Sequence, residues 1–200
     1  MSADELPELV FWGEESLMRC QAEVAAEDMQ HADWSQKIDV LVECMSAYGG
    51  IGIAAPQIGW DARVFCLGIA DDNARYPNAQ SMPLQVWVNP QIVTSRGQCW
   101  AWEGCLSVPG LRGWISRPAE ISVKGLNAIG DEVTQTLWGF AARVFQHEMD
   151  HLDGLLIPMR VPDARFLLSN ELMENRQSWQ SDWPSPGAYR TDPGVTSTIR

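Results

Sequence analysis

The sequence predicts one domain built from both α-helices and antiparallel β-strands. The segment between Asp33 and Gly49 has apolar residues at helical spacing, and residues 139–152 predict a second helix that ends at Gly154. Residues 120–124 and 132–137 alternate polar and apolar side chains on either side of a turn, which is typical of a β-hairpin. With 200 residues, the chain can bury one sizeable core, and its composition requires no second domain.

Further elements are predicted on either side of these three. Asp33, with Gln36 three residues later, has the pattern of an N-cap, so the first helix should begin there. Beyond these residues we expect a helix or irregular arm over 14–27, a strand over 63–70, a surface loop over 71–83, and short extended pieces over 86–89 and 91–94 that are broken at Pro90. We also expect a final helix over 163–175 and a loose tail over 177–200.

Bulk composition argues against several classes of function. The formal net charge of −12 would repel nucleic-acid phosphates, so direct nucleic-acid binding is not expected. Five cysteines occur without a CxxC pair, which is typical of a reducing cytoplasm. The acidic start lacks the features of a signal peptide, and no apolar run approaches the length of a membrane span. We therefore expect a cytoplasmic protein without a membrane segment.

The pattern HExxH, at residues 147–151 of the second predicted helix, predicts a metal site. Four residues advance a helix by about 400°, so His147 and His151 lie on one face and can share an ion. Glu148 lies about 100° away, where it can reach a water on the metal as a general base. A chance pattern is the alternative, but only 3 histidines occur in the chain, and two of them flank this Glu. The third, His31, is expected to be solvated.

A catalytic divalent site usually takes three protein ligands, so one ligand beyond the two histidines must be found. A metzincin site would need a histidine at position 157, which is Ile157. A thermolysin-like site would use a downstream carboxylate, and Glu171 falls at a suitable interval. Cys105 is the other candidate, because a thiolate is a good ligand for a borderline ion and Gly104 permits close backbone approach. The ordinary alternative for Cys105 is a buried cysteine with a structural role only. Spacing alone does not decide between Glu171 and Cys105 as the third ligand.

Three blocks occur in order along the chain: GIGIAAPQ at residues 50–57, EGCLS at 103–107 and QHEMDHL at 146–152. The set closely resembles peptide deformylases, whose signatures GφGφAAxQ, EGCφS and HExxH (φ apolar) are matched at every fixed position. The similarity extends through residues 109–113 and 154–155, so it covers about residues 35–160. Residues 1–30 and the tail after about Arg165 match nothing in this pattern.

The resemblance implies an α+β fold in which antiparallel β-sheets wrap a central helix carrying HExxH, with a core of about residues 35–165. It implies that Cys105, His147 and His151 hold one divalent ion, typically Fe(II) and replaceable by Ni(II) or Zn(II). The implied activity is hydrolysis of the N-formyl group from the initiator methionine of nascent polypeptides, with release of formate. We further expect a monomer that meets formylmethionyl nascent peptides, with the ribosome surface as a further partner.

The resemblance also assigns roles around the metal. Glu148 would take a proton from the attacking water and later protonate the leaving amine. The amide of Gln57 and the backbone N–H of Leu106 would bind the oxyanion, although Gln57 has a surface amide as its alternative. Gly52 and Gly104 would leave room for an extended peptide along the cleft edge. Glu103 and Arg112 are expected to be structural charges rather than catalytic groups.

The metal-bearing helix itself suggests the wall of a substrate pocket. Val144 and Phe140 precede His147 by three and seven residues, so they continue the ligand face as an apolar surface. Ile51 from the glycine-rich segment would complete a wall for a methionine side chain beside His147. Both helix residues have ordinary core packing as their alternative.

Overall fold

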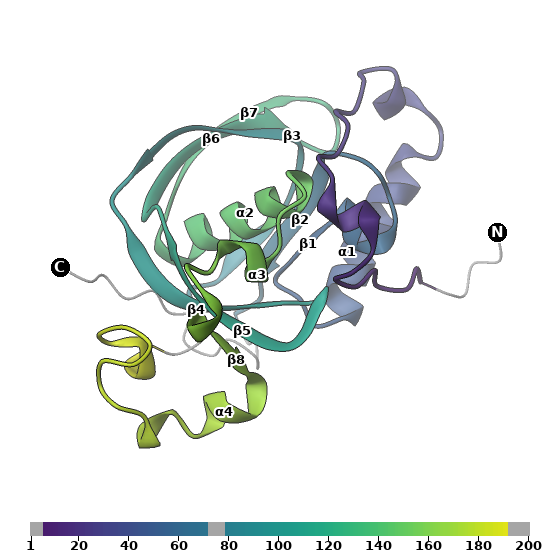
Figure 1. The fold of residues 1–200 in the computed structure, drawn as a ribbon. Helices are drawn as coiled ribbons and strands as arrows, with labels where there is room; N and C mark the ends of the chain where they lie inside the picture. Colours follow the sequence, from purple (N-terminus) through teal and green to yellow (C-terminus); the bar gives the residue numbers. More distant parts are fainter. Residues whose placement is uncertain (1–5, 72–78, 192–200) are drawn as a thin grey trace.

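The structure is a computed structural model that describes residues 6–71 and 79–191. Two antiparallel sheets organise it (Figure 1). The larger sheet has the strand order β1-β2-β3-β6-β7, and its strands are Gly52–Ala54, Val64–Ile69, Met82–Arg96, Glu120–Leu126 and Glu132–Trp138. The smaller sheet has the order β4-β5-β8, with strands Cys99–Cys105, Val108–Arg117 and Leu167–Ser169. The helices are α1 (Trp34–Ala47), α2 (Gly139–Leu152), α3 (Ile157–Arg160) and α4 (Asn170–Glu174).

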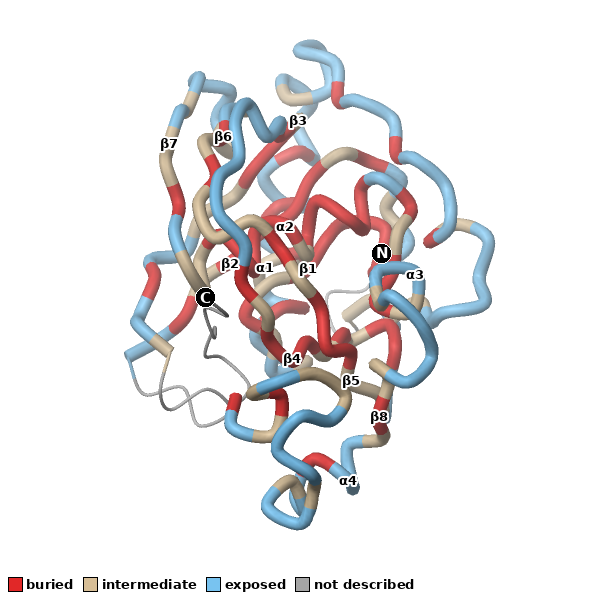
Figure 2. The backbone as a smooth tube through the Cα atoms, turned by 60° about the vertical axis from the view of Figure 1, so that its left-hand side comes forward, coloured by how far each residue is buried: buried red, intermediate tan, exposed pale blue. Residues whose placement is uncertain are grey.

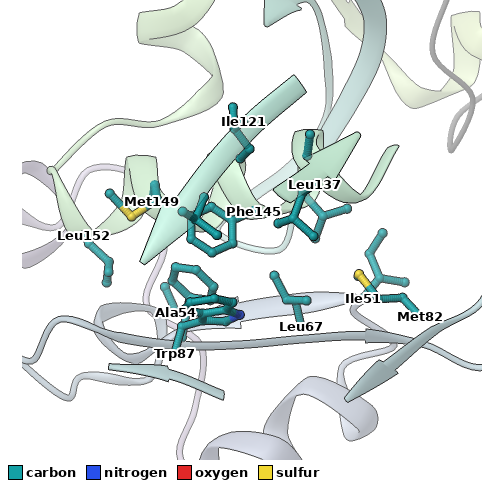
Figure 3. Packing of buried hydrophobic residues seen from close by; sticks show 14 of the residues in the cluster. Ile51, Ala54, Leu67, Met82, Trp87, Ile121, Leu137, Phe145, Met149 and Leu152 are labelled. Carbon is teal, nitrogen blue, oxygen red and sulfur yellow. The ribbon is translucent and has the colours of Figure 1, made fainter. Parts of the chain in front are cut away.

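Helix α2 is buried along most of its length and packs against β1, β2, β6 and β7 of the larger sheet (Figures 1 and 2). Its apolar face inserts Phe145 into the core, edge-on to Trp87 at 5.1 Å and to Phe65 at 5.0 Å between ring centroids. Figure 3 shows Phe145 facing Trp87 from the side of Ile121 and Leu137. Since a buried aromatic side chain contributes about 1.5 to 3 kcal/mol, this packing holds α2 firmly against the larger sheet.

The end of α2 is fixed by Gly154. This residue has φ 74°, in the left-handed region that glycine adopts without a steric penalty. A Cβ at this position would also lie 2.7 Å from the backbone carbonyl carbon of Arg19. Glycine is therefore required both to stop the helix and to let the N-terminal arm pass across it.

Most of the predicted core elements are present. The first helix begins at Trp34 as expected, but Asp33 does not cap it with its side chain and instead pairs with Lys37 at 2.9 Å. The predicted hairpin forms β6 and β7, and the strand predicted over 63–70 is β2. The arm over 14–27 is irregular, with one 3₁₀ turn at Glu15–Met18. No helix in the described ranges is long and apolar enough to cross a membrane.

Three predictions differ from the structure. The two pieces around Pro90 belong to one long strand, β3, whose irregularity is a change of register between Val88 and Gln91, with Asn89 at φ 48°. The helix predicted over 163–175 is wrong: Leu167–Ser169 form β8 on the edge of β5, and only Asn170–Glu174 are α-helical. The loop predicted over 71–83 lies partly outside the described residues, and its end already belongs to β3.

The expected loose tail instead folds against the smaller sheet as far as the structure describes it. Ala188 is fully buried, and its carbonyl accepts a hydrogen bond from Nε1 of Trp102 at 2.8 Å. Indole rings supply most of this contact, because Trp102, Trp114 and Trp179 form one cluster with Ala188. Tryptophans of the smaller sheet and of the C-terminal segment therefore pack together and stabilise the fold of that segment.

Candidate active site

Cys105, His147 and His151 lie together inside the domain. Their candidate ligand atoms all fall within 4.8 Å of one another, and Sγ of Cys105 lies 3.3 Å from Nε2 of His151. Cys105 and His151 are buried, and the side chain of His147 is 15% exposed. Among the described residues this is the group of His, Cys and acidic side chains with the geometry of a metal site.

Local structure explains why these three residues meet. His147 and His151 are one helical turn apart on α2, with ring centroids at 5.2 Å. Cys105 is the last residue of β4, just before the turn at Leu106 and Ser107 that leads into β5. The end of β4 therefore delivers a thiol to the face of α2 that carries both imidazoles.

Glu171, the alternative third ligand, lies elsewhere. It stands in the first turn of α4, where it is exposed, and its pKa is lowered by a hydrogen bond to backbone. It does not belong to the cluster that contains the two histidines. Cys105, the ligand implied by the family resemblance, is thus the one that the fold brings to the histidines.

A buried carboxylate fixes the orientation of His147. Oε2 of Glu103 lies 2.9 Å from Nδ1 of His147, which leaves Nε2 as the nitrogen free to act as a ligand. Glu103 also accepts hydrogen bonds from Arg117 at 2.6 and 2.8 Å and from Arg143. Burial alone would raise the pKa of Glu103, but the two guanidinium groups and His147 hold it well below its ordinary value. Glu103 is therefore an anion that positions a candidate ligand.

The surroundings of the two histidines shift their pKa values in opposite directions. Burial would lower the pKa of His147, but hydrogen bonds to Cys105 and Glu103 outweigh it and raise that pKa well above the ordinary value. Burial, together with the charges of His147 and Arg117, lowers the pKa of His151 well below the ordinary value. Metal ligation requires a neutral imidazole, so binding of an ion would release the proton from His147.

Glu148 is the buried carboxylate nearest to this cluster in sequence. It is 3% exposed, and burial raises its pKa to about 7, which suits a group that takes and returns a proton near neutral pH. Gly52 makes space for it, since a Cβ there would lie 2.3 Å from Oε1 of Glu148. Gly52 was expected to leave room for an extended peptide, and on the side of its missing Cβ the space is taken by the side chain of Glu148.

Gln57 has a defined orientation. Its Oε1 accepts a hydrogen bond from the backbone N–H of Ala54 at 2.8 Å, so the amide NH₂ must point the other way. Nε2 lies 3.0 Å from Oγ of Ser107 and 3.8 Å from Sγ of Cys105. Gln57 is 2% exposed, so the alternative of a surface amide is wrong, and its donor faces the candidate metal site.

A pocket opens beside the cluster. Its wall contains the residues predicted to bind substrate, namely Ile51, Gly52, Gly104, Phe140, Val144 and His147, together with Gln57, Cys105, Leu106 and Glu148. The side chain of Arg112 fills the space on one side of Gly104, since its Nη1 would lie 2.6 Å from a Cβ added there. Val144 and Phe140 also pack on the main core, so both the pocket and the core descriptions apply to them.

Some site residues were missed by the sequence patterns. Arg143 gives a partial signal, because it lies one turn before His147 on a buried helix, where an arginine needs an acidic partner. Arg117 gives no such signal in the sequence, because its partners are distant in the chain. It lies on β5 and pairs with Glu103 on β4 and with Asp150 on α2. Ser107 lies within the EGCLS block, yet its role in holding the Gln57 amide is visible only in space.

The donors fit a divalent ion. A thiol and two imidazoles are ligands that suit Fe(II), Zn(II) and Ni(II). Glu103 orients His147, and burial restricts Cys105 and His151. Oε2 of Glu148 and Nδ1 of His151 are buried without a hydrogen-bond partner in the described part of the chain. Together with an α+β fold, these features define the class: a hydrolase site of the HExxH type with a cysteine as its third candidate ligand.

Comparisons with known proteins identify the family. The polypeptide deformylase family model matches residues 7–166. Peptide deformylase 1 of Prochlorococcus marinus is 49% identical over 135 residues, which are 66% of this chain and 70% of that protein. Peptide deformylase 2 of Pseudomonas putida is 40% identical over 156 residues, 77% of this chain and 87% of that protein.

The structural comparison agrees. A crystal structure of class I type b peptide deformylase from Acinetobacter baumannii, bound to Met-Ala-Ser, superimposes with a TM-score of 0.75 at 36% identity. The match covers 78% of this chain and 99% of that one. The chain belongs to the peptide deformylase family and is an enzyme of the amide hydrolase class.

Proposed function

We propose that this chain hydrolyses the N-formyl group from the N-terminal formylmethionine of nascent polypeptides and releases formate. The observation that carries the proposal is that candidate ligand atoms of Cys105, His147 and His151 lie within 4.8 Å of one another. Cys105 and His147 of this group line a pocket together with Glu148 and Gln57. Family membership supports the same reaction.

Cys105, His147 and His151 would hold one divalent ion, Fe(II) in the native enzyme, with Ni(II) or Zn(II) as substitutes. When bound, such an ion lowers the pKa of a water ligand towards neutrality and polarises the formyl oxygen. Glu103 would keep His147 in the required tautomer through the bond at Nδ1. The position of α2 between the sheets supports the central, ligand-bearing helix implied by the family resemblance.

Glu148 is proposed as the general acid and base. The carboxylate takes a proton from the attacking water and gives it to the amine nitrogen as the bond to the formyl carbon breaks. Its buried position and its raised pKa, about 7, support both directions of transfer near neutral pH. The products are formate and a free N-terminal amine, so the proton taken up is returned within one turnover.

Gln57 and Leu106 are proposed to bind the oxyanion of the tetrahedral intermediate. The NH₂ group of Gln57 already faces the site because Ala54 holds its oxygen. The backbone N–H of Leu106 follows directly after Cys105, at the turn beside the pocket. Loss of one such donor typically reduces kcat by about 100- to 1,000-fold.

The methionine side chain is proposed to lie against Val144, Phe140 and Ile51. All three are apolar and belong to the wall of the pocket that contains His147. Gly52 and Gly104 lie where an extended peptide backbone would pass, on β1 and β4, which are both edge strands. The proposal therefore predicts a substrate in extended conformation with an unbranched apolar first residue.

We also propose that the enzyme works in the cytoplasm as a monomer and meets its substrate near the ribosome surface. All five cysteines are free, which supports a reducing compartment. The net charge of −12 favours a peptide substrate over direct contact with nucleic acid.

Formate release tests the proposed function. The protein is purified anaerobically, loaded in turn with Fe(II), Ni(II) or Zn(II), and incubated with a formyl-Met tripeptide and with its acetyl-Met counterpart as the control. The expected result is metal-dependent formate release from the formylated peptide only. Cleavage of an internal peptide bond without formate would instead identify an endopeptidase.

A further inference from the structure

The C-terminal segment, residues 176–191, contacts a residue of the catalytic pocket. Trp102 lies in the wall of that pocket, and its Nε1 donates to the carbonyl of Ala188 at 2.8 Å. The family model ends at residue 166, so the segment lies outside the region that defines the family. One partner in the contact, Ala188, therefore lies outside the residues that the family model matches.

We propose that residues 176–191 position the wall of the substrate pocket by holding Trp102, and with it the edge strand β4. This inference rests on the proposed function, since it concerns how tightly that site binds the formylated peptide. It makes Trp102 a positioning residue, and it gives the C-terminal segment a role in substrate affinity.

The position of β4 explains why a support is needed. This strand is at the edge of the smaller sheet and pairs only with β5. It carries Glu103, which orients His147, and Cys105, a candidate metal ligand. The indole of Trp102 packs with Trp114 and Trp179, whereas the carboxylate of the next residue, Glu103, contacts His147. A small shift of β4 would move both groups and the pocket wall together.

Residues 176–191 pack against the smaller sheet through contacts with the indole groups of Trp102 and Trp114. The ring of Trp102 packs against Trp114 at 5.3 Å and against Trp179 at 5.9 Å between centroids. Nε1 of Trp114 donates to Oγ of Ser185, so a second indole is tied to the same segment. Trp102 and Trp114 are 2% and 0% exposed, which shows that the segment and β8 together cover this face.

The segment is itself held in shape. Nη1 of Arg176 donates to the carbonyl of Thr191 at 2.7 Å, which joins its two ends. Oγ1 of Thr191 donates to the carbonyl of Gly187 at 3.2 Å, next to the residue that receives the Trp102 bond. A closed loop of this kind presents the Ala188 carbonyl at a fixed place, as a support for β4 requires. Figure 1 shows the segment in yellow at the lower left, below β4 and beside α4.

The test compares Trp102→Phe with a matched control, Trp34→Phe. Both substitutions remove one indole N–H that donates to a backbone carbonyl, since Nε1 of Trp34 donates to the carbonyl of Ala128 at 2.7 Å. Trp34 and Ala128 belong to a different hydrophobic cluster from Trp102. Loss of one buried hydrogen bond corresponds to roughly a five- to ten-fold change in an equilibrium. We expect Trp102→Phe to raise KM for a formyl-Met peptide by about that factor. Because β4 also carries Glu103 and Cys105, kcat and metal affinity should fall together with the rise in KM. Trp34→Phe should lower Tm without changing KM, kcat or metal affinity.

A chain that ends at residue 175 supplies the second arm. It should raise KM at least as much as Trp102→Phe, and adding Trp102→Phe to it should change KM no further, because the support is already gone. An equally large effect of Trp102→Phe in the shortened chain would overturn the proposal, since the ring would then act by touching substrate directly. Equal KM values for Trp102→Phe and Trp34→Phe would also overturn it.

Hydrogen exchange separates this proposal from the proposed function. The backbone amides of β4 should exchange faster in Trp102→Phe than in the wild type or in Trp34→Phe, whether or not the protein releases formate. Because hydrogen exchange is measured on full-length variants, it tests the positioning role even if the shortened chain fails to fold. Unchanged exchange in β4 would remove the positioning role, whereas absent formate release by the wild type would count only against the proposed function.

Discussion

Glu103 on β4 and His147 on α2 are joined by a contact of 2.9 Å between Oε2 and Nδ1. This contact connects the smaller sheet to the helix that carries both histidines. Because Arg117 and Arg143 keep Glu103 ionised, the imidazole is held with Nδ1 towards the carboxylate and Nε2 available to the candidate metal site. A residue expected to be merely a structural charge therefore determines how a candidate ligand is presented.

Glu103→Gln should weaken metal binding. The amide keeps the shape of the side chain but removes the charge that orients His147, and loss of such an outer partner typically reduces metal affinity about 10- to 100-fold. Competition with a chelator of known affinity measures this change. Asp150→Asn is the matched control, because Asp150 is also buried and pairs with Arg117 but is not bonded to a candidate ligand. Equal affinity losses in the two variants would show that general destabilisation, rather than orientation, is responsible.

Cys105→Ala should abolish stoichiometric metal binding, whereas Glu171→Ala should leave it intact. The thiol lies 3.3 Å from Nε2 of His151, but Glu171 is exposed on α4. Elemental analysis of the two anaerobically loaded variants distinguishes them. Full metal content in Cys105→Ala together with loss in Glu171→Ala would contradict the ligand set proposed above.

Gly52→Ala should separate metal binding from turnover. The added Cβ would lie 2.3 Å from Oε1 of Glu148, so the carboxylate must move, while the three candidate ligands are untouched. Misplacement of a catalytic group by about 1 Å can reduce the rate on the order of 100-fold. We expect kcat to fall by that order with metal content unchanged. A variant with normal kcat would mean that the observed position of Glu148 is not the one used in catalysis.

Specificity for methionine should depend on Val144. Because full burial of an apolar side chain contributes about 1.5 to 3 kcal/mol, formyl-Ala or formyl-Asp peptides should have kcat/KM about ten- to a hundred-fold below that of formyl-Met. Val144→Phe narrows the pocket, so it should lower kcat/KM for formyl-Met more than for formyl-Ala. If both substrates slow equally while the metal is retained, Val144 serves the core and not the pocket.

The sequence was most informative where local pattern determines structure. Periodicity and punctuating glycines were sufficient for α1, α2 and the β6–β7 hairpin, and the i, i+4 spacing placed His147 above His151. In each case the neighbours that matter are close in the chain. The Asp33 cap failed at the side-chain level because Lys37, one turn later, offers an ion pair.

The remaining features depend on contacts between distant residues. Leu167–Ser169 have helix-compatible composition, yet the free edge of β5 binds them as a strand, so tertiary pairing overrides local preference. Glu103 finds Arg117 and Arg143 on two other elements, and no spacing rule connects them. The C-terminal segment looked loose because it is rich in Ser, Pro and Gly, while its packing depends on Trp102 and Trp114 of the smaller sheet.

The account depends above all on Glu148 as the group that moves the proton. The most direct measurement is formate release by Glu148→Gln, with metal content determined on the same sample. Because Glu148 is placed beside the candidate ligands but is not one of them, the variant should retain one metal ion per chain. It should release formate from a formyl-Met peptide at a rate lower by at least about 100-fold, the lower range for loss of a positioned acid and base. Formate release within a few-fold of the wild type at full metal content would contradict the proposed mechanism.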